Sequence, residues 1–373
     1  MAPSSGPDSW PFGGEGDGQV TAQWAGGPRR EVLLIVSVDT EEDNWRPARD
    51  GITVENIREV RRVSRYLDRL GVATTYFTTY QVAIRPWAVD ILREASEGGG
   101  TEIGAHLHPW NTPPLEEALL PRNSMMKNLP AELQLAKLRR LTTTLTDAFG
   151  SPPTAFRAGR FGLDRDTVPA LASCGYQVDS SVTPFVSWEA TDDGPSFVGA
   201  PLDAYRIGVR RDVTIPQPGG PLLEIPLTCG YTRFRSARWR TLHQVLHAPP
   251  SRALHLAGVA SRLRVAKLTI LTPEAESVRD MLALTRGALE GGVRHLQLFF
   301  HSPSLQPGLT PWITTAADVD RLYAAIARYV DGLSKMASVR CATINEARVA
   351  LWFGEGKGER EGEPRAIAGS RGP

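Results

Sequence analysis

The hydrophobic positions of this chain alternate between short continuous runs and longer helical stripes. The first run, VLLIVSV at 32–38, is apolar throughout, which is typical of a strand buried on both faces. From about Val54 to Gly71 the apolar residues recur every three to four positions, which indicates an amphipathic helix. The same reasoning predicts further strands at 72–80, 102–108, 154–161, 176–181, 222–228, 294–301 and 338–344, and further helices at 86–97, 131–149, 164–174, 274–290, 316–336 and around Trp352.

Strand and helix therefore alternate about seven times. This order favours a mostly parallel sheet with helices outside it, either a barrel or a doubly wound sheet. The alternation breaks over about 185–270, which we interpret as an insertion. Its first part is rich in Gly, Pro and Asp, and its second part, 236–270, is basic and predicts an inserted helical pair or lid.

Composition adds limits to this picture. Residues 1–30 and 354–373 are rich in Gly and in Pro or charge, so we expect two disordered tails around one domain at 31–353. The 42 basic and 41 acidic residues leave a net charge of +1, which does not favour binding to nucleic acid or to an anionic membrane. Three widely spaced cysteines predict no disulfide framework. No secretory signal and no apolar run long enough to span a bilayer are evident, so we expect a cytoplasmic protein without an integral membrane segment.

Polar side chains collect at the carboxyl ends of five predicted strands. They are Asp39 and Glu41 after the first strand, His106 and His108 after the third, Arg157 after the fourth, Asp179 after the fifth and His301 at the end of the seventh. In parallel α/β barrels this end of the strands carries the active site. The pattern therefore predicts that these residues share one site.

Two of these pairs have a spacing of two residues, which in extended backbone places both side chains on the same side. His106 and His108 with one carboxylate make a two-histidine, one-carboxylate metal set with open positions. The second carboxylate of Asp39 and Glu41 is then free to act as general base. Taken alone, the His-x-His pair is equally consistent with a polar turn.

The other three residues each allow two interpretations. Arg157 either holds the Asp39 carboxylate or forms a structural ion pair. Asp179 either orients a histidine or caps the turn after its strand. His301 is either a general acid or a hydrogen-bonded core histidine. Four residues near these patterns are predicted at the surface: Glu42, Asp43, His243 and His247. The other two histidines, His255 and His295, have no setting that indicates a role.

Five segments, in order, resemble the motifs of the polysaccharide deacetylases with a NodB-homology domain: VSVDTEED, EIGAHLHPW, FRAGRFG, YQVDSSVTP and LQLFFHS. The resemblance covers roughly residues 30–345. The first three segments together resemble the WalW-like subgroup, which is associated with bacterial cell-surface polysaccharide clusters. The resemblance implies an α/β fold, a distorted (β/α)7 barrel of the NodB-homology type, with the helical insertion placed before the seventh strand.

The resemblance also implies a role for each residue: Asp39 as base, Glu41, His106 and His108 as metal ligands, Arg157 as partner of the base, Asp179 as the residue that orients the acid, and His301 as general acid. The chain departs from the common motifs in three ways. Thr40 stands where a second Asp is usual, which leaves Glu42 as an alternative ligand to Glu41. Trp110 stands where the second histidine is usual, and the third motif lacks its Pro and Tyr.

The expected function is a metal-dependent hydrolase that removes an N-acetyl group from an amino sugar. Its substrate would be a cell-surface polysaccharide or a cytoplasmic precursor of one. Two alternatives stay open: a non-catalytic carbohydrate-binding pseudo-enzyme, and a hydrolase of a cyclic amide or another small molecule. Zinc suits the ligand set, with cobalt, nickel or manganese as alternatives. Trp110 and Trp312 are expected either to stack on a sugar or to pack in the core.

Overall fold

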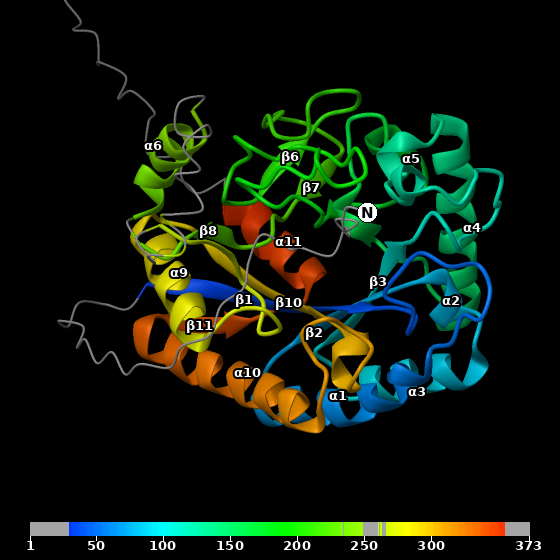
Figure 1. Cartoon of the computed structure of the whole chain (residues 1–373), viewed down its shortest axis with the longest axis horizontal. Coiled ribbons are helices and arrows are strands. Elements are labelled where there is room, and N and C mark those ends of the chain that lie inside the picture. The colour runs from blue at the N-terminus through cyan, green and yellow to red at the C-terminus, as the bar shows by residue number, and fades with distance from the viewer. Residues whose placement is uncertain (1–29, 234, 249–259, 261, 263–265, 355–373) are drawn as a thin grey trace, which may run out of the picture.

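The computed structural model describes residues 30–233, 235–248, 260, 262 and 266–354 (Figure 1). The strands are β1 (Glu31–Thr40), β2 (Thr74–Thr78), β3 (Thr101–Leu107), β4 (Ala155–Ala158), β5 (Val178–Asp179), β6 (Tyr205–Ile207), β7 (Leu222–Glu224), β8 (Cys229–Tyr231), β9 (Leu268–Ile270), β10 (His295–His301) and β11 (Ser338–Cys341). The α-helices are α1 (Val60–Arg69), α2 (Tyr80–Ala83), α3 (Pro86–Ser96), α4 (Ala131–Phe149), α5 (Val168–Ser173), α6 (Ser236–His247), α9 (Val278–Glu290), α10 (Ala316–Met336) and α11 (Ile344–Gly354). Short 3-10 helices are η1 (Glu55–Glu59), η2 (Pro121–Ser124), η3 (Met126–Asn128), η4 (Gly159–Phe161) and η5 (Ser302–Leu305).

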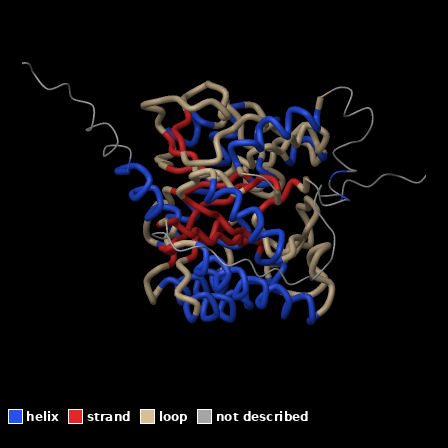
Figure 2. Tube along the Cα trace, turned by 90° about the vertical axis from the view of Figure 1, so that its left-hand side faces the viewer, coloured by secondary structure: helices blue, strands red, loops and turns tan. Residues whose placement is uncertain are grey.

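Nine of these strands form one sheet in the order β10-β1-β2-β3-β4-β5-β7-β6, with β11 also paired to β1. Every pair in it is parallel except β6–β7. The sheet curls into a half-barrel, and helices surround it, as Figure 1 and the turned view in Figure 2 show. The predicted fold class, a distorted α/β barrel with helices outside a mostly parallel sheet, is confirmed.

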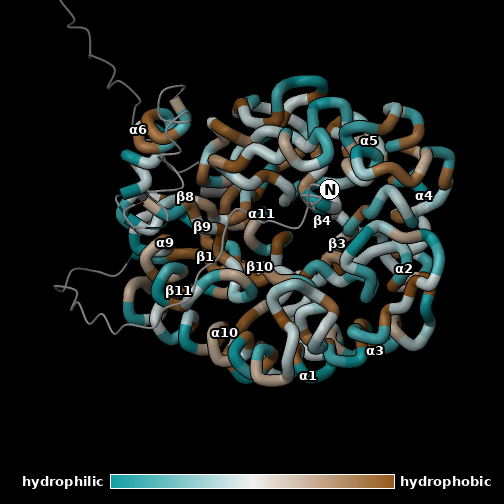
Figure 3. The backbone as a smooth tube through the Cα atoms, in the orientation of Figure 1, coloured by the Kyte–Doolittle hydropathy of each residue, from teal (hydrophilic) through white to brown (hydrophobic). Residues whose placement is uncertain are grey.

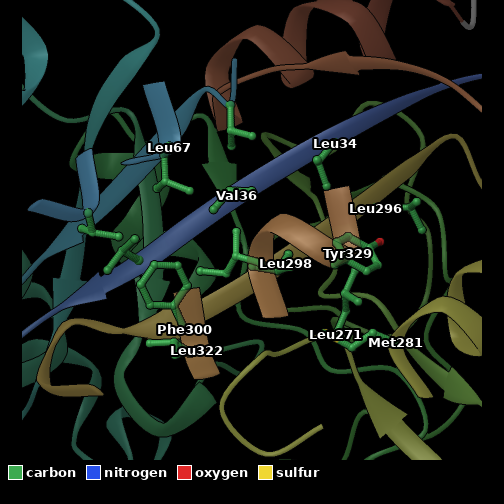
Figure 4. Packing of buried hydrophobic residues seen from close by; sticks show 14 of the residues in the cluster. Leu34, Val36, Leu67, Leu271, Met281, Leu296, Leu298, Phe300, Leu322 and Tyr329 are labelled. Carbon is green, nitrogen blue, oxygen red and sulfur yellow. The ribbon is translucent and has the colours of Figure 1, made fainter. Parts of the chain in front are cut away.

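The first strand supplies both layers of the core because its side chains alternate between two faces. Leu34 and Val36 point outward and pack with residues of β10 and α10, such as Leu298 and Leu322 (Figure 4). Their neighbour Ile35 points inward and belongs to a second buried cluster that includes residues of α11. This explains why the run is apolar at every position. Figure 3 shows the hydrophobic colour gathered on the central strands and the hydrophilic colour on the outer turns.

Several predicted elements differ from the structure. The strand predicted at 154–161 ends at Ala158, because Arg160 and Phe161 take positive φ angles of 54° and 58°. The short antiparallel strand β6 lies in the stretch where no element was predicted. The prediction that 236–270 is wholly helical is wrong at its end: α6 is present, but 268–270 forms β9, which pairs with β8. Residues 249–259, 261 and 263–265 lie outside the described residues.

The two predicted tails also lie outside the described residues, apart from Arg30 and Gly354. The three cysteines, Cys174, Cys229 and Cys341, are free thiols. No helix in the described part of the chain has the length and apolar character needed to cross a membrane.

Candidate active site

Strand alternation and register bring the predicted site residues onto one face of the sheet. Asp39 of β1 stands in register with His301 of β10, and His106 of β3 stands in register with Arg157 of β4. The residues beside them in sequence, such as Val38, Phe300, Leu107 and Phe156, pack in the outer clusters. The four polar side chains therefore point into the half-barrel at the carboxyl ends of its strands.

Glu41, His106 and His108 form a compact set of donor atoms. Their ligand atoms lie within 4.8 Å of one another, and all three side chains are buried. Glu41 Oε2 is 3.5 Å from His106 Nε2 and 3.2 Å from His108 Nε2. One carboxylate oxygen and two imidazole nitrogens are a donor set that suits zinc and similar divalent ions.

A second layer of hydrogen bonds orients both imidazoles. His106 Nδ1 lies 3.0 Å from the Arg157 carbonyl oxygen, and His108 Nδ1 lies 2.7 Å from Glu42 Oε1. These acceptors favour a proton on each Nδ1. Each Nε2 lone pair is then free to face the space between Glu41, His106 and His108, as in metal sites generally. The three residues therefore fit a divalent metal. The prediction of Glu42 at the surface is wrong: it is 2% exposed, and Asn111 also donates to it.

The charges around the donor set favour a cation. Burial raises the pKa of Glu41, but hydrogen bonds from His106 and His108, with the charges of His108 and His301, hold it well below its usual range. Burial lowers the pKa of His108, but the Glu42 and Glu41 carboxylates raise it to about 10. Metal binding at this site must therefore displace protons, and it will weaken as pH falls.

Gly159 permits the close approach of the third-motif segment to His108. A Cβ atom at this position would lie 2.5 Å from His108 Cδ2 and 2.6 Å from the Leu107 carbonyl oxygen. Both distances are too short for any side chain larger than that of glycine. The glycine therefore allows β4 and the turn after it to support the His108 ring.

Asp39 is held by the guanidinium group of Arg157. Arg157 Nη1 lies 2.5 Å from Asp39 Oδ1, and both side chains are buried. Arg157 also donates to Ser37 Oγ at 3.0 Å and to the Ser180 carbonyl oxygen at 2.9 Å. The second oxygen, Asp39 Oδ2, faces His106 Nε2 at 4.0 Å and His301 Nε2 at 3.9 Å. One carboxylate oxygen is thus anchored, and the other lies between the donor set and His301.

His301 is oriented by Glu274, a residue that the sequence analysis did not single out. Glu274 Oε2 lies 2.9 Å from His301 Nδ1, and Glu274 Oε1 accepts from the His301 backbone N–H at 3.1 Å. Burial lowers the pKa of His301, but the Glu274 charge and hydrogen bond, with Glu41 and Asp39, raise it to about 9. Glu274 follows β9, which the sequence predicted as helix. Because no strand was predicted there, Glu274 was not recognised as a residue at a strand end.

Asp179 does not orient His301 in the structure. Its register partner is Phe156, whose side chain lies in the outer cluster, so Asp179 points away from the inner face. Its carboxylate accepts from the backbone N–H and the hydroxyl of Ser181, both at 2.9 Å. Of the two interpretations offered for Asp179, the turn cap describes its contacts. The next residue, Ser180, is the one that faces Arg157.

Asp43 and His243, which were also predicted at the surface, both make specific contacts. Asp43 accepts hydrogen bonds from the backbone N–H groups of Glu55 and Asn56 and so caps η1. His295 is fully buried, and His243 is 6% exposed and lies 3.0 Å from the Tyr231 hydroxyl. His247 is exposed as expected, and His255 lies outside the described residues.

A cavity of about 410 Å³ opens above these groups. Asp39, Glu41, His106, His108 and His301 line its base. Trp110 also lines it, and its ring stacks on His108 with centroids 4.1 Å apart. Trp312 stacks on His301 at 6.0 Å. Both tryptophans therefore support site histidines. The long loop after Pro109 contributes to the wall, whereas the described residues of 236–270 do not line this cavity.

Comparison with known families agrees with this geometry. Residues 52–178 match the family model for polysaccharide deacetylase. The family acts on acetylated sugars, and the predicted enzyme class, a hydrolase of carbon–nitrogen bonds in amides, is that of the matched family. Its members are metal-dependent, in agreement with the donor set of Glu41, His106 and His108. No curated protein matches the chain.

The chain is similar to several solved structures at low sequence identity. A proposed glycoside hydrolase/deacetylase from Parabacteroides distasonis is 13% identical, with 88% of this chain and 72% of that chain covered and a TM-score of 0.51. A proposed polysaccharide deacetylase from Mycobacterium smegmatis is 16% identical, with 94% and 99% covered and a TM-score of 0.46. A family 4 carbohydrate esterase from Streptomyces lividans, solved with acetate, is 12% identical, with 84% and 91% covered and a TM-score of 0.36.

Proposed function

We propose that this protein removes the N-acetyl group of an amino sugar by metal-assisted hydrolysis. The observation that carries the proposal is the position of Asp39 Oδ2, which faces His106 of the donor set at 4.0 Å and His301 at 3.9 Å. A base, a metal site and an acid thus meet at the bottom of one cavity. The proposed substrate is a cell-surface polysaccharide or its precursor. The proposal also includes membership of the WalW-like subgroup.

Glu41, His106 and His108 would hold the metal. When bound, a divalent ion supplies Lewis-acid polarisation of the amide carbonyl and lowers the pKa of water. Zinc is the ion that the donor set favours.

The protein side chains would move the protons. Asp39 Oδ2 takes a proton from the attacking water while Arg157 keeps Oδ1 in place. The water oxygen forms a bond to the carbonyl carbon, and the carbon–nitrogen bond then breaks. His301 Nε2 gives its proton to the leaving nitrogen, and Glu274 stabilises the charged ring beforehand. The products are acetic acid, which ionises to acetate, and a free amine. The proton held by Asp39 then passes to His301, which restores both groups.

Two polar atoms of residues that line the cavity lack a hydrogen-bond partner in the described part of the chain. Trp110 Nε1 and Asn44 Oδ1 are both buried, and neither has a hydrogen-bond partner among the described residues. One is a donor and the other an acceptor, and unpaired buried groups of this kind cost free energy until a ligand or water satisfies them.

The first test is metal content by elemental analysis on wild type and on His106→Ala/His108→Ala. About one equivalent of divalent metal per chain is expected in the wild type, with loss of that metal in the double variant. The exposed His247→Ala variant is the matched control and should keep its metal. Absence of metal after reconstitution of the wild type would overturn the mechanism.

The second test is acetate release from N-acetylated amino sugars and from cyclic amides. Release from sugars that is lost in His301→Ala supports the proposal. Sugar binding that survives in His301→Ala, with no acetate released by either protein, would favour the carbohydrate-binding pseudo-enzyme. Turnover of cyclic amides alone would favour the small-molecule hydrolase.

A further inference from the structure

The wall of the cavity above the reacting groups carries many apolar side chains. Its apolar lining consists of Trp45, Pro47, Leu119, Leu120, Pro121, Met125, Phe161 and Trp188. Polar residues line it as well: Asn44, Arg46, Arg160, Thr191 and Asp192. Arg160 and Asp192 pair with each other at 2.6 Å. The apolar side chains thus form a large, continuous part of the wall, and they offer no hydrogen bonds to a chain of sugar hydroxyls.

Leu119, Leu120 and Pro121 form the mouth of this wall, and we call them the apolar rim. Leu119 is 46% and Leu120 is 53% exposed, whereas Asp39 and His106 at the base are each 2% exposed. Large apolar side chains that line a cavity and stay in water mark a surface that a ligand covers. A group that covers the rim must lie at the opposite end of the substrate from the amide.

The rim is held in place by a buried cation beneath its loop. Lys137 Nζ is fully buried and donates to the carbonyl oxygens of Pro109, Thr112 and Pro114 at 2.6–2.8 Å. It also pairs with Glu117, two residues before Leu119, at 3.0 Å.

Two further contacts complete this support. Arg49 donates to the same Glu117 carboxylate at 2.9 Å. On the other side of the rim, Arg160 donates to Ser124. The leucines are thus presented on an anchored loop, so covering them costs little ordering entropy.

We propose that the substrate is an N-acetylated amino sugar that carries an apolar aglycone, an alkyl, prenyl or aryl group, which covers the apolar rim. The proposal rests on the proposed function for the sugar end of the substrate. It assigns the apolar group to the aglycone and not to a longer acyl chain. The acyl carbon reacts at the buried base, and the sugar lies between it and the mouth.

The test compares methyl and hexyl glycosides of N-acetylglucosamine and N-acetylgalactosamine. Dissociation constants are measured by tryptophan fluorescence, and acetate release is measured on the same compounds. The hexyl glycoside should bind about tenfold or more tightly than the methyl glycoside, because each buried methylene favours binding. In Leu119→Ser/Leu120→Ser this ratio should fall towards one. Ile215→Ser, a 58% exposed residue away from the cavity, should keep the wild-type ratio.

The outcomes separate this proposal from the deacetylase proposal. Equal binding of both glycosides, with acetate released from both, overturns the aglycone site and leaves the deacetylase intact. Tighter hexyl binding without acetate release keeps the aglycone site and counts against deacetylation. A preference for methyl N-octanoylglucosaminide over the hexyl glycoside that the double variant abolishes would place the apolar group on the acyl side and overturn the proposal.

Discussion

His301 stands between two carboxylates, with Nδ1 2.9 Å from Glu274 and Nε2 3.9 Å from Asp39. The first contact orients the ring, and the second places its other nitrogen beside the proposed base. An imidazole held in this way carries a proton at neutral pH and presents it to the cavity. The contact between His301 and Glu274 joins β10 to the segment after β9. No local sequence pattern connects these two parts of the chain.

Glu274→Gln should move the alkaline limit of activity to lower pH. Among the effects on the His301 pKa, burial lowers it, whereas Glu274, Glu41 and Asp39 raise it to about 9. A general acid must be protonated, so the wild-type rate should fall as pH rises through about 9, and the variant should lose rate earlier. The measurement is kcat/KM against pH. An alkaline limb that stays in place would show that Glu274 does not set the proton affinity of His301.

Glu42→Gln should weaken metal binding without removing a ligand. Glu42 accepts from His108 Nδ1 at 2.7 Å, and partners of this kind typically change metal affinity about 10–100-fold. Affinity is measured by competition with a chelator. Asp43→Asn is the matched control, because Asp43 is the next acidic residue but caps η1 instead. Equal affinities in the two variants would contradict the role of Glu42.

Arg157→Met should destabilise the protein by about 3–5 kcal/mol, because it leaves the Asp39 carboxylate buried without its cation. Adding Asp39→Asn should recover part of that loss, since the uncompensated charge is then gone. The free energy of unfolding is measured by urea titration. If the double variant is as unstable as Arg157→Met, the cost comes from packing and not from charge.

Lys137→Met should reduce stability by about 2–3 kcal/mol through lost charged hydrogen bonds to the loop carbonyls. It should also raise KM for hexyl glycosides more than it lowers kcat, since it acts on the rim and not on the reacting groups. Lys335→Met, which removes a 70% exposed partner of Asp331, should cost less than about 1 kcal/mol. A fall in kcat with unchanged KM would argue against a positioning role.

The strand–helix order and the chemistry at the strand ends were predictable from sequence because both are local. Helices α4 and α10 have the predicted bounds, since their apolar periodicity and flanking residues agree. The spacing of two in Asp39 and Glu41, and in His106 and His108, already placed each pair on one side of extended backbone. The residue identities at the carboxyl ends then indicated a metal site.

Only the tertiary structure decided which of these residues meet. A shift of one position turns a strand residue to the other face, so Asp179 caps a turn while Ser180 faces Arg157. The carboxylate that contacts His301 belongs to Glu274, and the carboxylate that contacts His108 Nδ1 belongs to Glu42. Sequence determines the face and the chemistry of each strand end, because both follow from local backbone geometry. The partners across the site depend on how distant segments pack, and that is set by the fold as a whole.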